Sequence, residues 1–388
     1  MTLALLGLAI ALLLVLRVPV AFAFLGPALV YLAIEGQSTG FALRQVTNAA
    51  ASFPLLAVPL FVFLGALANH AGIADRLFRF ALALLARLRG NLGYVAVGVS
   101  VGFSWMSGSA VADAAALGKV QIPAMLRNGY SRRFATGLSG SSSLIAPIMP
   151  PSIPAVIFAG LAAVSTGALF AASVIPALLM AAGLCVVVWV LVRRNPKITR
   201  GEFDRAEFVA SLKGVVLPLI SPIIILGGIL GGIFTPTEAA AVGAAGTFLI
   251  ALAARSLDRK SIMEACLATA SATAMIFLIV LGAAALNSFL ALSQVPQVLA
   301  AWVGEQGFNP WIVMILVLIF YLVMGCVMDS LSMILLTVPI IFPMMSVLDF
   351  GLTPDEFGIW FGIIVLIVVE VGLIPPPVGM NLFIINSM

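Results

Sequence analysis

The chain has 388 residues, of which 63% are hydrophobic and only 9% charged, and its mean hydropathy is +1.22. A soluble globular domain is roughly half apolar and about a quarter charged, so this composition excludes one. The formal net charge of +4 says less than the placement of the basic residues. Apolar stretches of about 18 residues or more recur along the chain, each long enough to cross a bilayer. The sequence therefore predicts an all-α polytopic membrane protein.

The first apolar stretch is predicted to be a membrane helix that stays in the protein. A signal peptide carries its basic residues before its apolar core. Within residues 1–23 the only basic side chain, Arg17, follows that core. We therefore expect two successive crossings, at 1–16 and 19–35, rather than a leader that is removed.

Proline and aspartate residues recur in the same order at a nearly constant offset, which indicates an internal repeat. Pro19 matches Pro236 at an offset of 217. Asp113 matches Asp329 at an offset of 216. The predicted units are a first repeat at 1–192, a cytoplasmic linker at 193–212 and a second repeat at 213–388.

Each repeat is predicted to contain five crossings, a re-entrant helical hairpin and a broken transmembrane helix. An odd number of crossings per unit makes the second repeat inverted relative to the first. The predicted crossings are 1–16, 19–35, 53–71, 134–163 and 168–192, then 213–234, 236–254, 266–286 and 357–388. The hairpins are predicted at 92–126 and 309–347, and the broken helices are 134–163 and 357–388. A fifth crossing of the second repeat would start near position 393, so we expect a C-terminally truncated and less stable second half.

The positions of the Lys and Arg residues provide a test of this topology. If the loops 72–91 and 127–133 are cytoplasmic, the alternation of crossings places nearly all Lys and Arg residues on that side. Cytoplasmic loops of membrane proteins are expected to be basic. The sequence therefore predicts that the linker is cytoplasmic and that the N-terminus lies on the opposite face.

Two proline-rich strings interrupt apolar segments at matching positions of the repeats. They read IMPPSIPAVIF at 148–158 and LIPPPVGMNLF at 373–383. Proline breaks helices, and irregular backbone at membrane depth is tolerated only where it is buried in protein or lines a cavity. Paired breaks in inverted repeats are typical of secondary transporters, whose unwound carbonyls bind Na⁺ and whose half-helix N-termini face anionic substrate groups. A proline-kinked helix in a static bundle is the alternative.

Hydroxyl groups gather near the first break and at the first hairpin tip. The tip is expected at 107–109, where Gly permits the turn and Ser caps the following helix. Gly325 and Ser330 are expected to play these roles in the second hairpin. Four serines lie within 139–143, in an otherwise apolar run. This clustering suggests a hydrated or ion-binding position.

Four carboxylates lie in or near predicted membrane segments, where ionisable groups are functional suspects. Asp113 and Asp329 are repeat mates near the start of each hairpin's second helix, and each is either functional or a partner of the helix dipole. Glu238 lies in the first turn of a helix and is expected to be structural. Glu370 lies just before the second break. Lys119 is expected either to pair with Asp113 or to extend to the cytoplasmic surface.

Several segments together resemble one transporter family along essentially the whole chain. They are PLFVFLGALANHAG (59–72), GSAVADAAALGKVQIPAMLRNGY (108–130), APIMPPSIPAVIF (146–158), GGIFTPTEAAAVG (231–243) and GLIPPPVGMNLF (372–383). The chain resembles the DctM-like large membrane subunit of tripartite ATP-independent periplasmic (TRAP) transporters. The resemblance implies a bacterial inner-membrane protein with a periplasmic N-terminus and an elevator mechanism driven by sodium. It also implies a small four-helix membrane subunit and a periplasmic binding protein that delivers an organic acid, such as a C4-dicarboxylate or a sugar acid.

The resemblance implies Na⁺ sites where hairpin tips meet broken helices. The implied Na⁺ ligands are Ser107, Gly108, Ser142 and Pro147 on one side and Gly325, Gly372 and Pro375 on the other. Pro375 stands where the family often has threonine, so a hydroxyl ligand is missing there. Substrate is expected to touch the half-helix after each break, where Asn381 is polar within an apolar run; a buried amide bonded to backbone is the alternative. The expected substrate-binding residues are Ser109, Ser143, Asp329 and Asn381.

Two other functions are alternatives to a sodium-coupled importer of organic acids. A stand-alone divalent-anion/sodium symporter has a similar repeat plan but typically carries Ser-Asn-Thr at its hairpin tips. Here the tips read Ser-Gly-Ser and Gly-Cys-Val, which favours the TRAP-type protein. An intramembrane hydrolase with Ser107 as nucleophile would need a base within hydrogen-bond reach. The only histidine, His70, is expected at a membrane face, so the sequence does not predict an enzyme.

Overall fold

A computed structural model describes the chain from residue 2 to residue 387. It leaves out residues 17, 35, 37–39, 41–43, 45–46, 49–50, 52, 196–197, 199–200, 255 and 376–378. Among the described residues every regular element is helical, which confirms the all-α fold class. The predicted ion ligand Pro375 is described, whereas Pro376 and Pro377 lie outside the described residues.

The N-terminal helices are α1 (Thr2–Val15), α2 (Val20–Ile34), the 3-10 turn η1 (Phe53–Leu56), α4 (Ala57–His70), α5 (Ile73–Leu84), α6 (Asn91–Ser107), α7 (Ala110–Arg127), α8 (Arg132–Ser142), the 3-10 turn η2 (Ser143–Ile145), α9 (Ile153–Ala162) and α10 (Thr166–Arg193). The C-terminal helices are α11 (Arg205–Leu230), α12 (Pro236–Ala253), α13 (Arg259–Ser293), α14 (Val295–Glu305), α15 (Pro310–Gly325), α16 (Ser330–Ser346), α17 (Pro354–Gly372) and α18 (Met380–Ser387).

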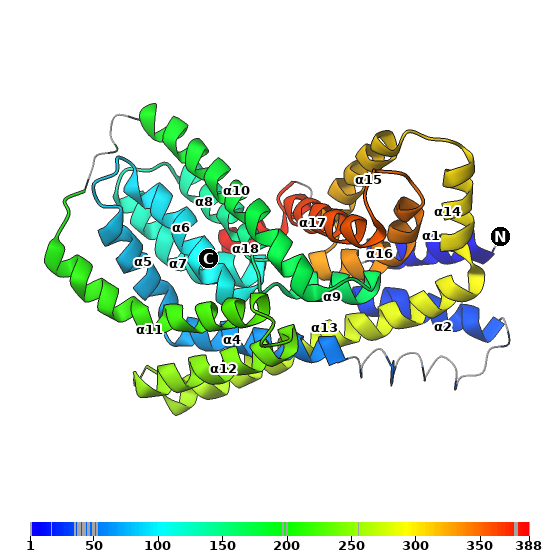
Figure 1. Cartoon of the computed structure of the whole chain (residues 1–388), viewed down its shortest axis with the longest axis horizontal. Helices are drawn as coiled ribbons and strands as arrows, with labels where there is room; N and C mark the ends of the chain where they lie inside the picture. Colours follow the sequence, from blue (N-terminus) through cyan, green and yellow to red (C-terminus); the bar gives the residue numbers. More distant parts are fainter. Residues whose placement is uncertain are drawn as a thin grey trace.

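The helices form two bodies that are joined below by long helices and, between the bodies, by the contacts of α9 with α16 and of α10 with α17. In Figure 1 the left body contains α5, α6, α7, α8, α10 and α11, and the right body contains α14, α15, α16 and α17. Below them α13 packs on α2 and α4, and α4 packs on α12. With 35 residues α13 is about 50 Å long. It therefore reaches from one body to the other.

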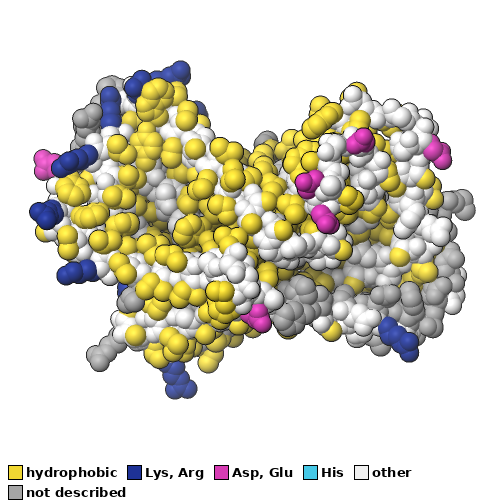
Figure 2. Space-filling view, in the orientation of Figure 1, with side chains coloured by type: hydrophobic (Ala, Val, Ile, Leu, Met, Phe, Trp, Pro, Cys, Tyr) yellow, Lys and Arg dark blue, Asp and Glu magenta, His cyan; other side chains and the backbone are white. Residues whose placement is uncertain are grey.

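The surface is that of a membrane protein. Large apolar side chains are exposed on the outer helices, among them Ile175 and Leu179 of α10, Leu249 of α12 and Leu316 of α15. In the view of Figure 2, most Lys and Arg side chains gather at the left end of the long axis. Most Asp and Glu side chains in this view lie over the right body. The topology inferred from the basic residues stays a prediction.

Spanning helices are fewer than the predicted crossings, because many segments are broken. In the described part of the chain, α10, α12 and α13 are each long and apolar enough to cross a membrane. Two bent pairs raise this number to five if each pair counts as one span. One is α4 with α5, bent by 63°, and the other lies within α11, bent by 48° between 205–216 and 219–230.

The predicted cytoplasmic loop 72–91 contains a helix that the sequence reading missed. Helix α5 is amphipathic and buries Ile73, Leu77 and Phe78, at helical spacing on one face. The bend before it falls at Gly72, whose φ of +68° suits a residue without a Cβ. The apolar helix α4 therefore bends at this glycine, and the chain continues as the amphipathic helix α5 where the sequence predicted a loop.

Two helix starts differ from the predicted crossings because aspartates cap them earlier. Helix α11 begins inside the predicted linker, where Asp204 accepts a hydrogen bond from the amide of Ala206 at 2.8 Å. Helix α13 begins before position 266, where Asp258 accepts from the amide of Ser261 at 2.7 Å. Hydrogen bonds from the hydroxyl and amide of Ser261 hold the pKa of Asp258 below its usual value.

Each predicted hairpin is a pair of helices joined by a short turn, α6–α7 and α15–α16. Each predicted broken helix is interrupted near its prolines, between η2 and α9 and between α17 and α18. The second half of each broken helix packs on the other hairpin, because α9 packs on α16 and α18 packs on α7. The two breaks and the two hairpins therefore form one packed unit. The inverted relation of the repeats stays a prediction.

Candidate functional site

The first hairpin tip lies directly against the first helix break. Gly108 has a φ of +56°, and a Cβ at this position would lie 2.8 Å from the carbonyl oxygen of Pro151. On the other side, a Cβ on Gly65 of α4 would lie 3.2 Å from the Cα of Ser107. Glycines thus let three backbone segments approach closely at the tip. Ser109 caps α7 by accepting from the amide of Ala112 at 3.4 Å.

Asp113 and Ser107 form a buried pair at this tip. The Ser107 hydroxyl donates to one carboxylate oxygen of Asp113, whose side chain is fully buried. The other carboxylate oxygen has no hydrogen-bond partner among the described residues. Lys119 is exposed, and no ion pair joins it to Asp113 in the described part of the chain. The exposure of Lys119 agrees with the alternative in which its side chain extends to the surface.

A buried chain of hydroxyl and amide groups connects the first hairpin to α8. The Ser100 hydroxyl donates to the hydroxyl of Ser142 at 3.0 Å, and Ser142 donates to the carbonyl of Ser139 at 3.3 Å. The Ser139 hydroxyl donates to the side-chain oxygen of Gln121 at 3.3 Å, and Gln121 donates to the carbonyl of Ala96 at 3.2 Å. The predicted ligand Ser142 thus lies within a polar network.

Ser100 and Gln121 were missed by the sequence reading, although a signal was present. Ser100, Ser104 and Ser107 are spaced so that they share one face of an apolar helix, and all three are buried. Gln121 is a lone amide within the second limb of the hairpin. Polar side chains at helical spacing in a membrane hairpin would have identified this network.

The first break is buried and internally bonded. Every residue from 142 to 159 is buried. The Ser152 hydroxyl donates to the carbonyl of Pro147 and accepts from the amide of Ala155 at 3.2 Å, which caps α9. The Ser143 hydroxyl donates to the carbonyl of Gly140 at 2.9 Å. A carbonyl has two lone pairs, so Pro147 keeps one free for a cation.

The second hairpin meets the second break at two glycines. A Cβ on Gly325, at the end of α15, would lie 2.7 Å from the Cα of Gly372, at the end of α17. The structure therefore brings these two predicted ligands together. Pro375 follows in the break, and a Cβ on Gly379 would lie 3.7 Å from its carbonyl oxygen.

Asp329 caps α16 at the second tip. Its carboxylate accepts from the amide of Ser332 at 3.1 Å and from the hydroxyl of the same residue. The structural alternative for Asp329, a partner of the helix dipole, is therefore present in the fold. Glu238 is likewise structural, because it forms a capping box with Thr235 at the start of α12.

Asn381 is fully buried at the start of α18. Neither its amide nitrogen nor its amide oxygen has a hydrogen-bond partner among the described residues. Helix α18 packs on α7 and α8, with Leu382 and Ile385 placed 3.2 Å from where a Cβ on Gly140 would lie. Asn381 therefore lies within the predicted second repeat of the sequence, but its helix packs against the first hairpin. The alternative of an amide bonded to neighbouring backbone shows no such bond among the described residues.

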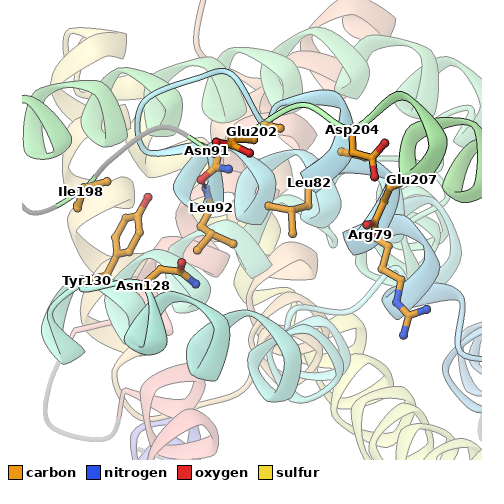
Figure 3. Close-up of a pocket in the computed structure, with 13 residues that line it drawn as sticks. Arg79, Leu82, Asn91, Leu92, Asn128, Tyr130, Ile198, Glu202, Asp204 and Glu207 are labelled. Atoms are coloured by element: carbon orange, nitrogen blue, oxygen red, sulfur yellow. Dashed lines mark hydrogen bonds between the residues drawn. The ribbon is translucent and has the colours of Figure 1, made fainter.

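A polar pocket of about 330 Å³ lies away from both tips. It opens beneath the segment that follows α10, and Figure 3 shows Arg79, Asn128, Tyr130 and Glu207 around it. Arg89 holds this segment by donating to the carbonyl oxygens of Ile198, at 3.2 Å, and Asn195, at 3.3 Å. None of the predicted site residues lines this pocket.

A transition-metal centre is not indicated. In the described part of the chain, no group of three or more His, Cys, Asp or Glu side chains could hold a metal ion. His70 lies at the surface, with its Nδ1 atom 3.8 Å from a carboxylate oxygen of Glu264. The polar groups at the tips are serine hydroxyls, carbonyls and carboxylates, which are oxygen ligands of the kind that hard cations prefer.

Residues 7–388 match the family described as "Tripartite ATP-independent periplasmic transporter, DctM component". The chain belongs to the DctM family of TRAP transporters. Its relatives include the sialic acid TRAP transporter large permease protein SiaM of Vibrio cholerae, 37% identical over 95% of this chain and 86% of that protein. The C4-dicarboxylate large permease DctM of Pseudomonas aeruginosa is 36% identical over 87% of this chain and 78% of that protein. The 2,3-diketo-L-gulonate large permease YiaN of Escherichia coli is 31% identical over 89% of this chain and 80% of its own length.

A solved structure agrees at the level of the fold. The YdaH transporter of Alcanivorax borkumensis superposes with a TM-score of 0.59 at 14% identity, covering 89% of this chain and 80% of that chain. The DctM-family match makes this chain a transporter permease and not an enzyme. The chain is a multi-pass inner-membrane protein. Large permeases of this family work with a small membrane subunit and a periplasmic substrate-binding protein.

Proposed function

We propose that this DctM-family chain imports an organic acid by sodium-coupled secondary transport. The observation that carries the proposal is the meeting of each hairpin tip with a helix break, Gly108 with Pro151 and Gly325 with Gly372. Each meeting point offers carbonyl and hydroxyl oxygens of the kind that bind Na⁺ in broken-helix transporters. A stand-alone divalent-anion/sodium symporter is disfavoured by the family match.

The substrate class follows from chemistry and from the relatives. The named substrates of the relatives are sialic acid, C4-dicarboxylates and diketogulonate, all of which carry a carboxylate. The N-termini of α9 and α18 carry partial positive charge toward the breaks, which suits such an anion. Asn381, Ser109, Ser143 and Asp329 are the side chains proposed to contact it.

An elevator movement is proposed for the step that carries substrate across. The hairpins and the broken helices pack on one another, and α2, α4, α12 and α13 form a second group. The two groups meet where α4 packs on α6 and α13 packs on α16. We propose that the first group slides past the second at these contacts as a rigid body. The chain is proposed to work with a small four-helix subunit and a periplasmic binding protein, with its own N-terminus periplasmic.

Uptake into proteoliposomes tests the proposal. The large and small subunits would be reconstituted together, and a panel of binding proteins loaded with radiolabelled organic acids would be added outside. We expect uptake of at least one acid that requires its binding protein and an inward sodium gradient. Uptake driven by a pH gradient in sodium-free buffer would contradict the sodium coupling.

A further inference from the structure

Glu370 is the most deeply buried carboxylate of the second half. It lies in the last turn of α17, two residues before the glycine that meets the second hairpin, and is 1% exposed. Neither of its carboxylate oxygens makes a hydrogen bond of normal geometry with any described residue. Asp329 and Ser330, at the tip of the second hairpin, are its polar neighbours. A buried carboxylate in such a position needs a compensating positive charge or a proton.

No basic side chain of the described residues supplies that charge. Residues 261–388 contain no Lys, Arg or His. The helices that pack on α17 are α9, α10, α15 and α16, and the only basic residue among them is Arg193, the last residue of α10. Among the described residues, Asp329 is the only charged group that interacts with Glu370, and its charge has the same sign.

The helix ends around Glu370 carry partial charges of both signs. Helix α16 begins at Ser330 with a partly positive N-terminus, which Asp329 caps. Helices α15 and α17 both end where Gly325 meets Gly372, and the C-terminal end of a helix carries partial negative charge. The carbonyl oxygen of Tyr321 lies 3.4 Å from where a Cβ on Gly372 would be, so α15 presents its last turn to this point. Two helix C-termini and two carboxylates therefore converge beside the start of α16, and no basic side chain among the described residues joins them.

We propose that Glu370 is an anionic ligand of a cation site in the second half, shared with Ser330 and Asp329 at the hairpin tip. This inference rests on the proposed function and names a ligand that sequence reasoning did not assign. Pro375 offers no side-chain hydroxyl in the adjoining break. Glu370, in the helix turn before the break, replaces the missing hydroxyl ligand with a negatively charged carboxylate. The ion is Na⁺, a hard cation that takes carboxylate, hydroxyl and carbonyl oxygens.

The test compares Glu370→Gln with Glu305→Gln in the purified complex of large and small subunits. Glu305 is an exposed carboxylate at the end of α14, so its variant removes the same charge without touching the site. The readout is the thermal unfolding midpoint as NaCl replaces choline chloride at constant ionic strength. We expect Glu370→Gln to raise the apparent sodium midpoint about tenfold or more, which corresponds to about 1.4 kcal/mol of lost binding. Glu305→Gln should leave it unchanged.

Two further results separate the possibilities. Without sodium, Glu370→Gln should be more stable than the wild type, because the amide removes an uncompensated buried charge. If Glu370→Gln does not fold, Glu370→Asp, which keeps the charge on a shorter side chain, should bind sodium with an intermediate midpoint. An unchanged sodium midpoint in either folded variant overturns the inference, as does a wild type stabilised by acid instead of sodium, since a shared proton would then neutralise the pair. Wild-type uptake without any sodium dependence would instead overturn the proposed function.

Discussion

The two hairpin tips differ in how they satisfy their polar groups. The first tip is rich in hydroxyls, and its buried Asp113 accepts a hydrogen bond from Ser107. The second tip has fewer hydroxyls and more charge, with Glu370 unpartnered beside Asp329. Both tips nevertheless use a glycine to bring hairpin and break into backbone contact. The two tips thus share the close backbone approach, whereas their polar chemistry differs.

The largest expected effect comes from filling the glycine contact of the second tip. Gly325→Val places a branched side chain where a Cβ would already lie 2.7 Å from the Cα of Gly372. Neither backbone can move away without separating α15 from α17, so we expect a loss of about 3 kcal/mol or more and no transport. Gly304→Val is the control, because a Cβ there meets nothing within 4 Å. Equal unfolding midpoints in detergent for both variants would show that the contact is not tight.

A glycine substitution at the first tip tests whether its backbone contact is equally tight. Gly108→Ala forces an alanine into a left-handed conformation and toward the carbonyl of Pro151. We expect a loss of about 2 kcal/mol, of which roughly 1–2 kcal/mol comes from the backbone conformation alone. Gly98→Ala, on the same hairpin with open space around it, should be neutral or slightly stabilising. If Gly108→Ala matched Gly98→Ala in unfolding midpoint and uptake, the two tips would not be equivalent.

A smaller effect is expected from cutting the hydroxyl and amide network that joins the first hairpin to α8. Gln121→Ala leaves the buried hydroxyl of Ser139 without its acceptor, at a cost of about 1–2 kcal/mol. Thr136→Ala, which removes an exposed hydroxyl on α8, is the control. Sodium titrations should show a weakened first site in Gln121→Ala and an unchanged second one. A variant as stable as the control would indicate that the network does not stabilise the tip.

The smallest change in stability, with a large change in function, is expected for Asn381. Its amide makes no hydrogen bond among the described residues, so Asn381→Ala should unfold within about 1 kcal/mol of the wild type. Uptake should fall roughly tenfold, the loss expected when one neutral hydrogen bond to substrate is removed. Membrane insertion, measured by the amount of purified complex, serves as the control. Unchanged uptake would remove Asn381 from the substrate site.

Local features of the sequence predicted much of this site. Proline strings located both breaks, and Ser107, Gly108 and Gly325 located both tips, because these residue types act on the backbone within a few positions. The exchange of α9 and α18 between the hairpins was not predicted, since it depends on packing between segments far apart in sequence. The surroundings of Glu370 were missed for the same reason. Helix α5 lies in a segment predicted to be a loop, because charged residues interrupt the apolar residues of its buried face.

The exchange of half-helices has a consequence for how the protein is made. Helix α7 leaves the ribosome early, whereas its partner α18 follows about 250 residues later, roughly 10–50 s at 5–20 residues per second. During that interval the first hairpin is in the membrane without the segment that covers it. Contacts between such distant segments also slow folding. Biogenesis of this permease must therefore keep the first hairpin from forming other contacts until α18 has been synthesised.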